Sequence, residues 1–276
     1  MRVSALLRGG AATVAAGALV ALAGVSPATA AQSADSGSKG GAKPTVVLVH
    51  GAWEDGSNWA AVSALLQQDG YKVAVPANPL RGLASDAEYL SAYLQQATTG
   101  PVILVGHSYG GSVITNVSDP DVKGLVYVDA FIPDQGETLG QIVGGSKSAL
   151  NVQEPTSVYN VVGFPGGDAD AYVKPDVFST SVAQDLPKKV RDVLAASQRP
   201  IALSAVSEAS GVPAWKTTPS WAVVGTADKV LPARTQTQMA QRAGASITQV
   251  SASHLSMLSK PAAVTKVIEA AAKAAR

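Results

Sequence analysis

Cysteine is absent from this chain of 276 residues, which excludes a disulfide framework and any zinc site built on cysteine ligands. The three histidines leave little for another transition-metal cluster. Charged residues make up 15% of the chain and nearly balance, and no basic run offers a footing for nucleic acid or an anionic membrane. We therefore expect no metal, no cofactor and no nucleic-acid partner. The fold must rest on its core, which a hydrophobic content of 46% permits.

The beginning of the chain has the pattern of a secretory signal peptide. Arg2 and Arg8 precede an apolar run over residues 11–25, and Ala-Thr-Ala at 28–30 supplies a small-residue cleavage site. The run is too short and too rich in alanine and glycine to span a membrane well. We expect cleavage after Ala30, a flexible lead-in over residues 31–43 and one folded domain over residues 44–276. The predicted product is a secreted protein with no membrane anchor.

Apolar runs of strand length alternate with helical patterns along that domain. The predicted strands lie at residues 45–49, 71–75, 102–105, 122–128, 220–224 and 247–250. Such alternation predicts an α/β fold with a mostly parallel sheet of about six strands and helices on both faces. It lapses over about residues 133–219, a stretch too long for a loop, so we expect an inserted helical cap there.

Residues 102–111 read Val-Ile-Leu-Val-Gly-His-Ser-Tyr-Gly-Gly. The four apolar residues suit a strand buried on both faces, and the small residues at the end suit the start of a helix. A G-x-S-x-G turn between strand and helix holds its serine in a strained conformation, with the hydroxyl presented above the sheet edge. Ser108 is therefore the predicted nucleophile.

A serine hydroxyl needs a base to take its proton, and the chain has three candidate histidines. His107 neighbours Ser108 in the turn, so its side chain must point away from the nucleophile. His50 ends a buried strand, where it is expected to brace the following loop. His254 follows the last predicted strand, at the edge where parallel sheets gather catalytic groups, and is the predicted base.

The base in turn needs a carboxylate to fix its tautomer. Asp228 follows the penultimate strand and Asp129 follows the strand after the nucleophile, so the chain order Ser, Asp, His fits either residue. The turn Gly-Thr-Ala-Asp-Lys-Val-Leu-Pro around Asp228 looks suited to presenting a side chain, which favours Asp228. Asp129 remains the alternative, with a structural hydrogen bond as its other interpretation.

Two backbone amides are expected to bind the oxyanion of the reaction. One belongs to Tyr109, the residue after the nucleophile. The other comes from the loop after the first strand, where Trp53 is preferred and Ala52 is the alternative.

Four motifs carry a resemblance to a known family: Val-Leu-Val-His-Gly-Ala-Trp, Gly-His-Ser-Tyr-Gly-Gly, Gly-Thr-Ala-Asp and Ser-His-Leu-Ser-Met-Leu-Ser-Lys-Pro. From about Thr45 onward the sequence resembles the α/β-hydrolase family, within it the branch of plant methylesterases and hydroxynitrile lyases with bacterial esterase-like relatives. The resemblance implies that fold and a Ser-His-Asp triad, with the acid after the penultimate strand, as at Asp228. The lyases carry a lysine and a threonine where this chain has Leu255 and Gly51.

A secreted serine hydrolase of the carboxylesterase type is the leading functional hypothesis. The insertion has no cluster of arginine or lysine to hold an acid group, so we expect a neutral ester of small to medium size. Perhydrolysis or other acyl transfer, a lyase-like reaction and a non-catalytic binding protein are the alternatives. The side chains predicted to line the pocket are Ala52, Phe131, Tyr159, Phe164, Trp215 and Met257.

Overall fold

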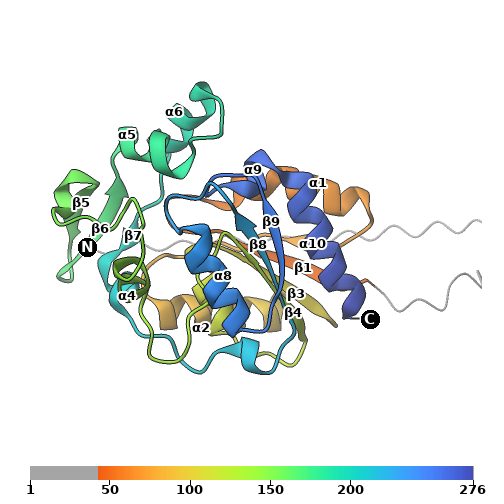
Figure 1. Ribbon diagram of the computed structural model, residues 1–276. Coiled ribbons are helices and arrows are strands. Elements are labelled where there is room, and N and C mark those ends of the chain that lie inside the picture. Colours follow the sequence, from red (N-terminus) through yellow and green to blue (C-terminus); the bar gives the residue numbers. More distant parts are fainter. Residues whose placement is uncertain (1–42, 276) are drawn as a thin grey trace, which may run out of the picture. The chain divides into compact units, whose positions relative to one another are not determined.

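The computed structural model describes residues 43–275, so the predicted signal peptide and almost all of the lead-in lie outside the described residues. Six parallel strands form one sheet in the order β2-β1-β3-β4-β8-β9 (Figure 1). Their bounds are Thr45–Val49 (β1), Val73–Ala74 (β2), Val102–His107 (β3), Val122–Val128 (β4), Ser220–Gly225 (β8) and Ser246–Val250 (β9). The α/β fold with a six-stranded, mostly parallel sheet is thereby confirmed, although β2 is shorter than predicted.

Helices cover both faces of this sheet, because its inner strands are apolar on both sides. Val46 and Leu48 of β1 pack in the core beneath α1 (Ala60–Gln68) and α10 (Pro261–Ala274). Val47 and Val49 point the other way, into the core with α2 (Leu83–Ala97), α3 (Tyr109–Thr115) and α8 (Ala233–Arg242). Both cores are closed to solvent.

The order of the strands marks the place where a binding site is expected, at the carboxyl ends of the strands, which we call the sheet edge. From β1 the chain moves outward to β2, then returns across β1 to β3 and continues to β4. The direction therefore reverses between β1 and β3, and ligands of open parallel sheets bind beyond the carboxyl ends of strands at such a point. Because the strands are parallel, the loops that follow β1, β3, β8 and β9 all begin at these carboxyl ends.

The insertion between β4 and β8 is mixed rather than helical. It contains a separate antiparallel sheet in the order β5-β6-β7, with bounds Tyr159–Phe164, Asp168–Val173 and Ile201–Ala202. The prediction of a helical cap missed the hairpin, whose turn uses positive φ angles at Gly166 and Gly167. The helical elements of the insertion are α4 (Leu139–Gly144), η2 (Pro155–Ser157), α5 (Pro175–Val177), η3 (Phe178–Val182), α6 (Lys188–Ala196), α7 (Leu203–Ser207) and η4 (Ala214–Lys216).

Capping contacts hold the start of two helical elements. The α2 helix begins at Leu83, where the Glu208 carboxylate accepts the free backbone amides of Leu83 and Ala84. Glu208 belongs to the insertion, so the sequence around α2 does not predict this cap. A short 3-10 turn, η1 (Gly56–Trp59), precedes α1 and is capped by the Asp55 side chain, which accepts the Ser57 amide.

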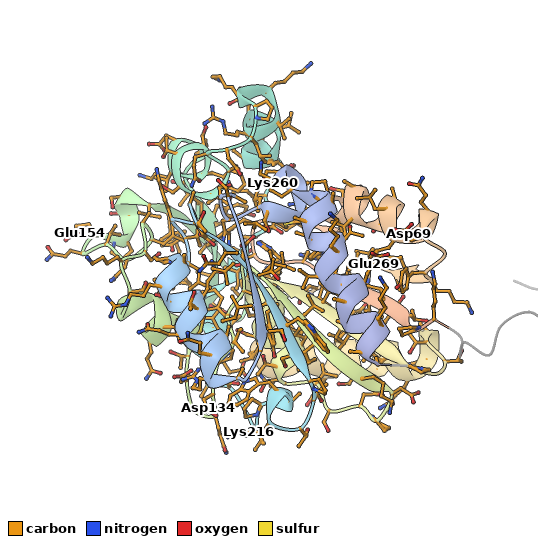
Figure 2. All side chains as sticks on the ribbon, turned by 45° about the vertical axis from the view of Figure 1, so that its right-hand side comes forward. Asp69, Asp134, Glu154, Lys216, Lys260 and Glu269 are labelled. Atoms are coloured by element: carbon orange, nitrogen blue, oxygen red, sulfur yellow. The ribbon has the colours of Figure 1, made fainter. Side chains whose placement is uncertain are left out.

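Charged side chains lie on the outside of these layers. Figure 2 shows Asp69, Lys260 and Glu269 projecting from the helical face, and Asp134 beside Lys216, which forms an ion pair at 3.0 Å. Among residues 43–275, no helix combines the length and apolarity that crossing a membrane requires.

Candidate active site

Ser108 stands alone between a strand and a helix, at the sheet edge described above. β3 ends at His107 and α3 begins at Tyr109, and Ser108 between them has φ 49° and ψ −121°. Strand and helix pass so closely that a Cβ on Gly106 would lie 2.5 Å from the Gly110 carbonyl oxygen. A Cβ on Gly110 would lie 2.6 Å from the Val49 carbonyl oxygen, so the G-x-S-x-G spacing is a steric requirement of this turn.

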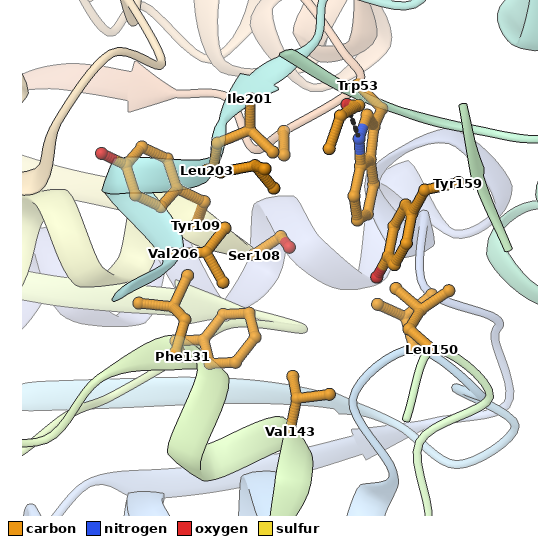
Figure 3. Close-up of a pocket in the computed structure, with 14 residues that line it drawn as sticks. Trp53, Ser108, Tyr109, Phe131, Val143, Leu150, Tyr159, Ile201, Leu203 and Val206 are labelled. Carbon is orange, nitrogen blue, oxygen red and sulfur yellow. Dashed lines mark hydrogen bonds between the residues drawn. The ribbon is translucent and has the colours of Figure 1, made fainter. Parts of the chain in front are cut away.

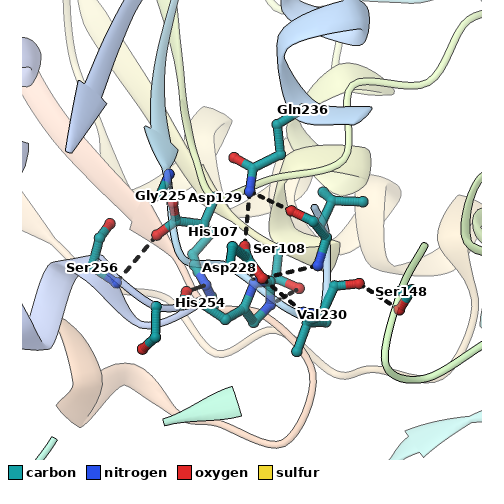
Figure 4. A network of polar contacts seen from close by, with 12 residues as sticks. His107, Ser108, Asp129, Ser148, Gly225, Asp228, Val230, Gln236, His254 and Ser256 are labelled. Atoms are coloured by element: carbon teal, nitrogen blue, oxygen red, sulfur yellow. Dashed lines mark hydrogen bonds and ion pairs between the residues drawn. The ribbon is translucent and has the colours of Figure 1, made fainter. Parts of the chain in front are cut away.

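His254 joins Ser108 to Asp228 in one chain of hydrogen bonds (Figure 4). Its Nδ1 lies 2.7 Å from Asp228 Oδ2, and its Nε2 lies 2.9 Å from Ser108 Oγ. A carboxylate can only accept, so Nδ1 carries the proton and Nε2 is left as the acceptor for the serine hydroxyl. All three side chains are buried. The structure therefore brings together the three residues that the sequence singled out.

The Asp228 carboxylate is held by further donors. Its Oδ1 accepts the backbone amides of Val230 at 2.8 Å and Leu231 at 2.9 Å, and its Oδ2 also accepts Gln236 Nε2 at 2.8 Å. These donors fix the plane of the carboxylate. The acid is thereby oriented toward His254 before any substrate arrives.

Asp129, the other candidate acid, does not hydrogen bond to His254. Its two oxygens accept the backbone amides of Gly225 at 2.7 Å and Ser256 at 3.1 Å. Burial, together with the nearby charge of Asp228, raises the pKa of Asp129 to about 7. Asp129 thus ties β8 to the loop after His254, which is the structural role considered for it.

The other two histidines brace the surrounding backbone. His50 Nδ1 donates to the Gly51 carbonyl at 2.9 Å and its Nε2 accepts the amide of Asn78 at 3.1 Å, and burial lowers its pKa. His107 donates from Nε2 to the His254 carbonyl at 2.8 Å and faces the buried Glu54 carboxylate at 3.0 Å. Burial lowers the pKa of His107, but Glu54 and Asp129 raise it by more. Neither ring contacts the Ser108 hydroxyl.

The oxyanion site differs from the preferred prediction. The Trp53 amide donates to the Arg199 carbonyl at 2.8 Å, so it is not free to bind an oxyanion. The amides of Ala52 and Tyr109 have no acceptor among residues 43–275, and both residues line the pocket around Ser108. The preference for Trp53 was therefore wrong and the alternative, Ala52, fits. Arg199 belongs to the insertion, so the loop sequence could not reveal this contact.

An apolar cavity of about 130 Å³ opens onto Ser108 (Figure 3). Of the six side chains predicted to line it, Ala52, Phe131 and Tyr159 do so. Phe164 instead lies under the Arg81 guanidinium, 5.4 Å from ring centre to Arg81 Cζ. Trp215 donates from Nε1 to the Pro133 carbonyl at 3.0 Å, and Met257 is fully buried in the sheet core. Size alone had suggested these three, and size does not fix the direction of a side chain.

Half of the residues that line the cavity are aliphatic residues of the insertion, and the prediction from the sequence included none of them. None of the lining residues is charged. The Trp53 indole N–H is engaged with the Ala171 carbonyl and the Tyr109 hydroxyl with Asp86, whereas the Tyr159 hydroxyl has no partner among the described residues. The lining residues missed by the sequence analysis are Leu139, Val143, Leu150, Ala171, Ile201, Leu203, Val206 and Val230.

Metal-binding side chains are not grouped near this cavity or elsewhere in residues 43–275. Within that part of the chain, no three residues of histidine, cysteine, aspartate or glutamate are placed to hold a metal ion.

Comparison with known proteins places this arrangement in a family. The model of the alpha/beta hydrolase family matches residues 46–267. A carbendazim hydrolyzing esterase from Nocardioides sp. (strain SG-4G) is 33% identical over 150 residues, 42% of this chain and 62% of that esterase. A pyrethroid hydrolase from Sphingobium wenxiniae is 34% identical over 131 residues, 40% of this chain and 46% of that enzyme. The matched regions thus span about half to three fifths of these curated relatives.

Solved structures show the same fold. The crystal structure of polyneuridine aldehyde esterase superimposes with a TM-score of 0.71 at 18% identity, over 83% of this chain and 99% of that chain. The family model, the six-stranded sheet and the serine turn agree over nearly the whole described part. The chain belongs to the alpha/beta hydrolase family.

Proposed function

We propose that this protein is a serine hydrolase that cleaves neutral carboxylic esters through an acyl-enzyme on Ser108. The hydrogen-bonded chain from Ser108 through His254 to Asp228, opening into an apolar cavity, carries this proposal. The names of the relatives support it, since the two described above are an esterase and a hydrolase.

The geometry accounts for each step of that reaction. His254 Nε2 takes the proton of Ser108 as the serine oxygen attacks the ester carbonyl, and Asp228 stabilises the imidazolium that forms. The amides of Ala52 and Tyr109 stabilise the negative oxygen of the tetrahedral intermediate. His254 then gives its proton to the departing alcohol, and water repeats the sequence on the acyl-enzyme to release the acid and restore the serine.

The cavity favours substrates of limited size without charge. Its volume of about 130 Å³ is smaller than the roughly 300–1,000 Å³ of pockets that take drug-sized ligands. No lysine or arginine lines it to pair with a carboxylate, so a charged acyl group would lose its hydration without compensation. We therefore infer a small to medium neutral ester, recognised by shape and apolar contact.

A lyase reaction is less well supported by this site. Leu255 follows His254 and is fully buried in the apolar core, so no ammonium group stands there to stabilise a cyanide leaving group. Gly51 offers no hydroxyl.

Secretion is part of the proposal and rests on the sequence of residues 1–30. Expression of the full chain in a secreting bacterial host, followed by N-terminal sequencing of protein from the medium, tests it. A mature chain beginning at Ala31 is expected. Retention of the whole chain in the cell, with its first residues intact, would contradict secretion.

A panel of p-nitrophenyl esters with acyl chains from acetyl to dodecanoyl tests the activity and its preference together. The wild type is expected to hydrolyse short and medium chains, with kcat/KM falling gradually for longer ones. Ser108→Ala, purified in the same way, controls for background hydrolysis. Equal rates for the wild type and Ser108→Ala would refute the proposed function.

A further inference from the structure

Two adjacent residues of the insertion hold the loops that carry the acid and the base. Gln184 donates from Nε2 to the Ala227 carbonyl at 2.7 Å. Asp185 accepts the Ser253 amide at 2.9 Å with one oxygen and the Ser253 hydroxyl with the other. Ala227 directly precedes Asp228, and Ser253 directly precedes His254. We call this pair of residues, Gln184 and Asp185, the insertion clasp.

The contact between Asp228 and His254 depends on how these two loops are placed. The loops follow different strands, β8 and β9, and the 2.7 Å between Nδ1 and Oδ2 is set where they meet. Within the sheet domain, the Ala227 amide donates to the Ala252 carbonyl at 3.0 Å, and Asp129 joins Gly225 to Ser256. The insertion clasp is a further connection, and it comes from a different part of the fold.

Asp185 provides the hydrogen-bond acceptors of Ser253 within the described part of the chain. Ser253 is fully buried, and its amide and hydroxyl hydrogen bond to no other residue in the described part of the chain. Burial raises the pKa of Asp185, but the hydrogen bonds that its carboxylate accepts from Ser253 contribute to an overall lowering of that pKa. Without Asp185, two buried donors would have to find water or another acceptor, and the loop would have to move.

We propose that Gln184 and Asp185 are positioning residues that set the geometry between Asp228 and His254. They touch neither substrate nor reacting atoms, and act through the residues next to the acid and the base. The proposal rests on the proposed function of the Ser108 site. It gives the insertion a second task, since the same segment that walls the cavity also keeps the base aligned with its acid.

Asp185→Ala tests the clasp against a matched control, Asp192→Ala. Like Asp185, Asp192 is an exposed aspartate of the insertion, but its partner is Lys188, one turn away on α6. Asp185→Asn is the conservative variant, because its amide can accept the Ser253 N–H and donate to the Ser253 hydroxyl. Gln184→Ala removes the other half of the clasp, at a partly buried position, and is a second variant in case Asp185→Ala fails to fold.

Two readouts separate positioning from general stability. The first is kcat and KM for p-nitrophenyl butyrate, with kcat divided by the number of sites that a fluorophosphonate titrates. Asp185→Ala is expected to lower kcat per active site by about 10–100-fold, and Gln184→Ala is expected to lower it by less. KM should change little in either variant, since small displacements of catalytic groups act on turnover. Asp185→Asn should recover most of the loss, and Asp192→Ala should match the wild type.

The second readout is the downfield proton resonance of His254 Nδ1–H, assigned by its loss in His254→Gln. It reports the hydrogen bond to Asp228 without any substrate. We expect it in the wild type, Asp192→Ala and Asp185→Asn, and expect it shifted or lost in Asp185→Ala. An unchanged resonance and unchanged kcat per site in both Asp185→Ala and Gln184→Ala would overturn the clasp. Absence of wild-type turnover with the resonance intact would instead refute the proposed function alone.

Discussion

The sheet edge and the insertion contribute opposite kinds of surface to one site. At the sheet edge the side chains of Ser108, His254 and Asp228 are buried and joined by hydrogen bonds, and Asp228 alone accepts four. The insertion faces the cavity with aliphatic side chains and one unpartnered hydroxyl, that of Tyr159. Burial raises the pKa of Tyr159 to about 12, so this hydroxyl stays neutral. Under the proposed function, the sheet edge would perform the reaction and the insertion would select the substrate, with the proposed insertion clasp connecting them.

The largest loss of activity is expected from substitutions of the predicted nucleophile and base. Ser108→Ala and His254→Ala are each expected to lower kcat/KM by about 10⁴–10⁶-fold, because each removes a member of one catalytic unit. The double variant should lose little more. The temperature of thermal unfolding should stay close to that of the wild type in each variant. Additive losses in the double variant, measured on the same ester, would contradict a shared unit.

The two buried acids provide the next comparison, within the sheet edge. Asp228→Asn should lower turnover by about 10²–10⁴-fold because the amide misorients His254. Asp129→Asn should cost less than about 10-fold in turnover but more in stability, since its amide group would face two backbone N–H donors. Kinetics and urea unfolding of both variants check this. A larger loss of turnover in Asp129→Asn would reverse the assignment.

Trimming the insertion should alter selection without harming the reaction. Val206→Ala enlarges the cavity, and we expect the ratio of kcat/KM for octanoate over acetate esters to rise by about 10-fold. Val193 is 60% exposed on α6, so Val193→Ala is the matched control and should leave the ratio unchanged. A drop in kcat/KM for all esters alike would show that Val206 belongs with the reacting groups.

Buried titrating groups of the sheet edge should also make stability depend on pH. The pKa of His107 is raised in the fold, so its contribution is complete below about pH 6.5 and is lost as the pH rises through its folded pKa. Asp129, with a folded pKa of about 7 against 3.8 unfolded, binds its proton more tightly when folded and acts in the same direction. The free energy of unfolding should therefore fall by about 1 kcal/mol between pH 6.5 and 8.

Urea unfolding at the two pH values measures this fall. Glu54→Gln removes the carboxylate that faces His107 and should flatten the pH dependence, whereas the exposed Asp192→Ala should not. A wild type that becomes more stable as the pH rises over this range would contradict the assignment of these buried groups.

The sequence predicted the sheet edge far better than the insertion, for physical reasons. Ser108, Asp228 and His254 each follow a strand, and parallel strands end at one edge, so their meeting could be expected from chain order. The Trp53 amide was misassigned because its acceptor, Arg199, lies far along the chain. Phe164 and Met257 were misplaced because composition does not reveal the direction of a side chain. The hairpin of β5 and β6 had a visible signal, the Pro-Gly-Gly turn at residues 165–167.

The central claim is that Ser108 carries the acyl group of a neutral ester during turnover. Rapid quenching of the wild type with p-nitrophenyl butyrate, followed by proteolysis and mass spectrometry, measures this directly. The account predicts a butyryl group on the peptide that contains Ser108, absent from Ser108→Ala and present in the Asp192→Ala control. Continued turnover of the ester by Ser108→Ala, or a butyryl group on another residue alone, would contradict it.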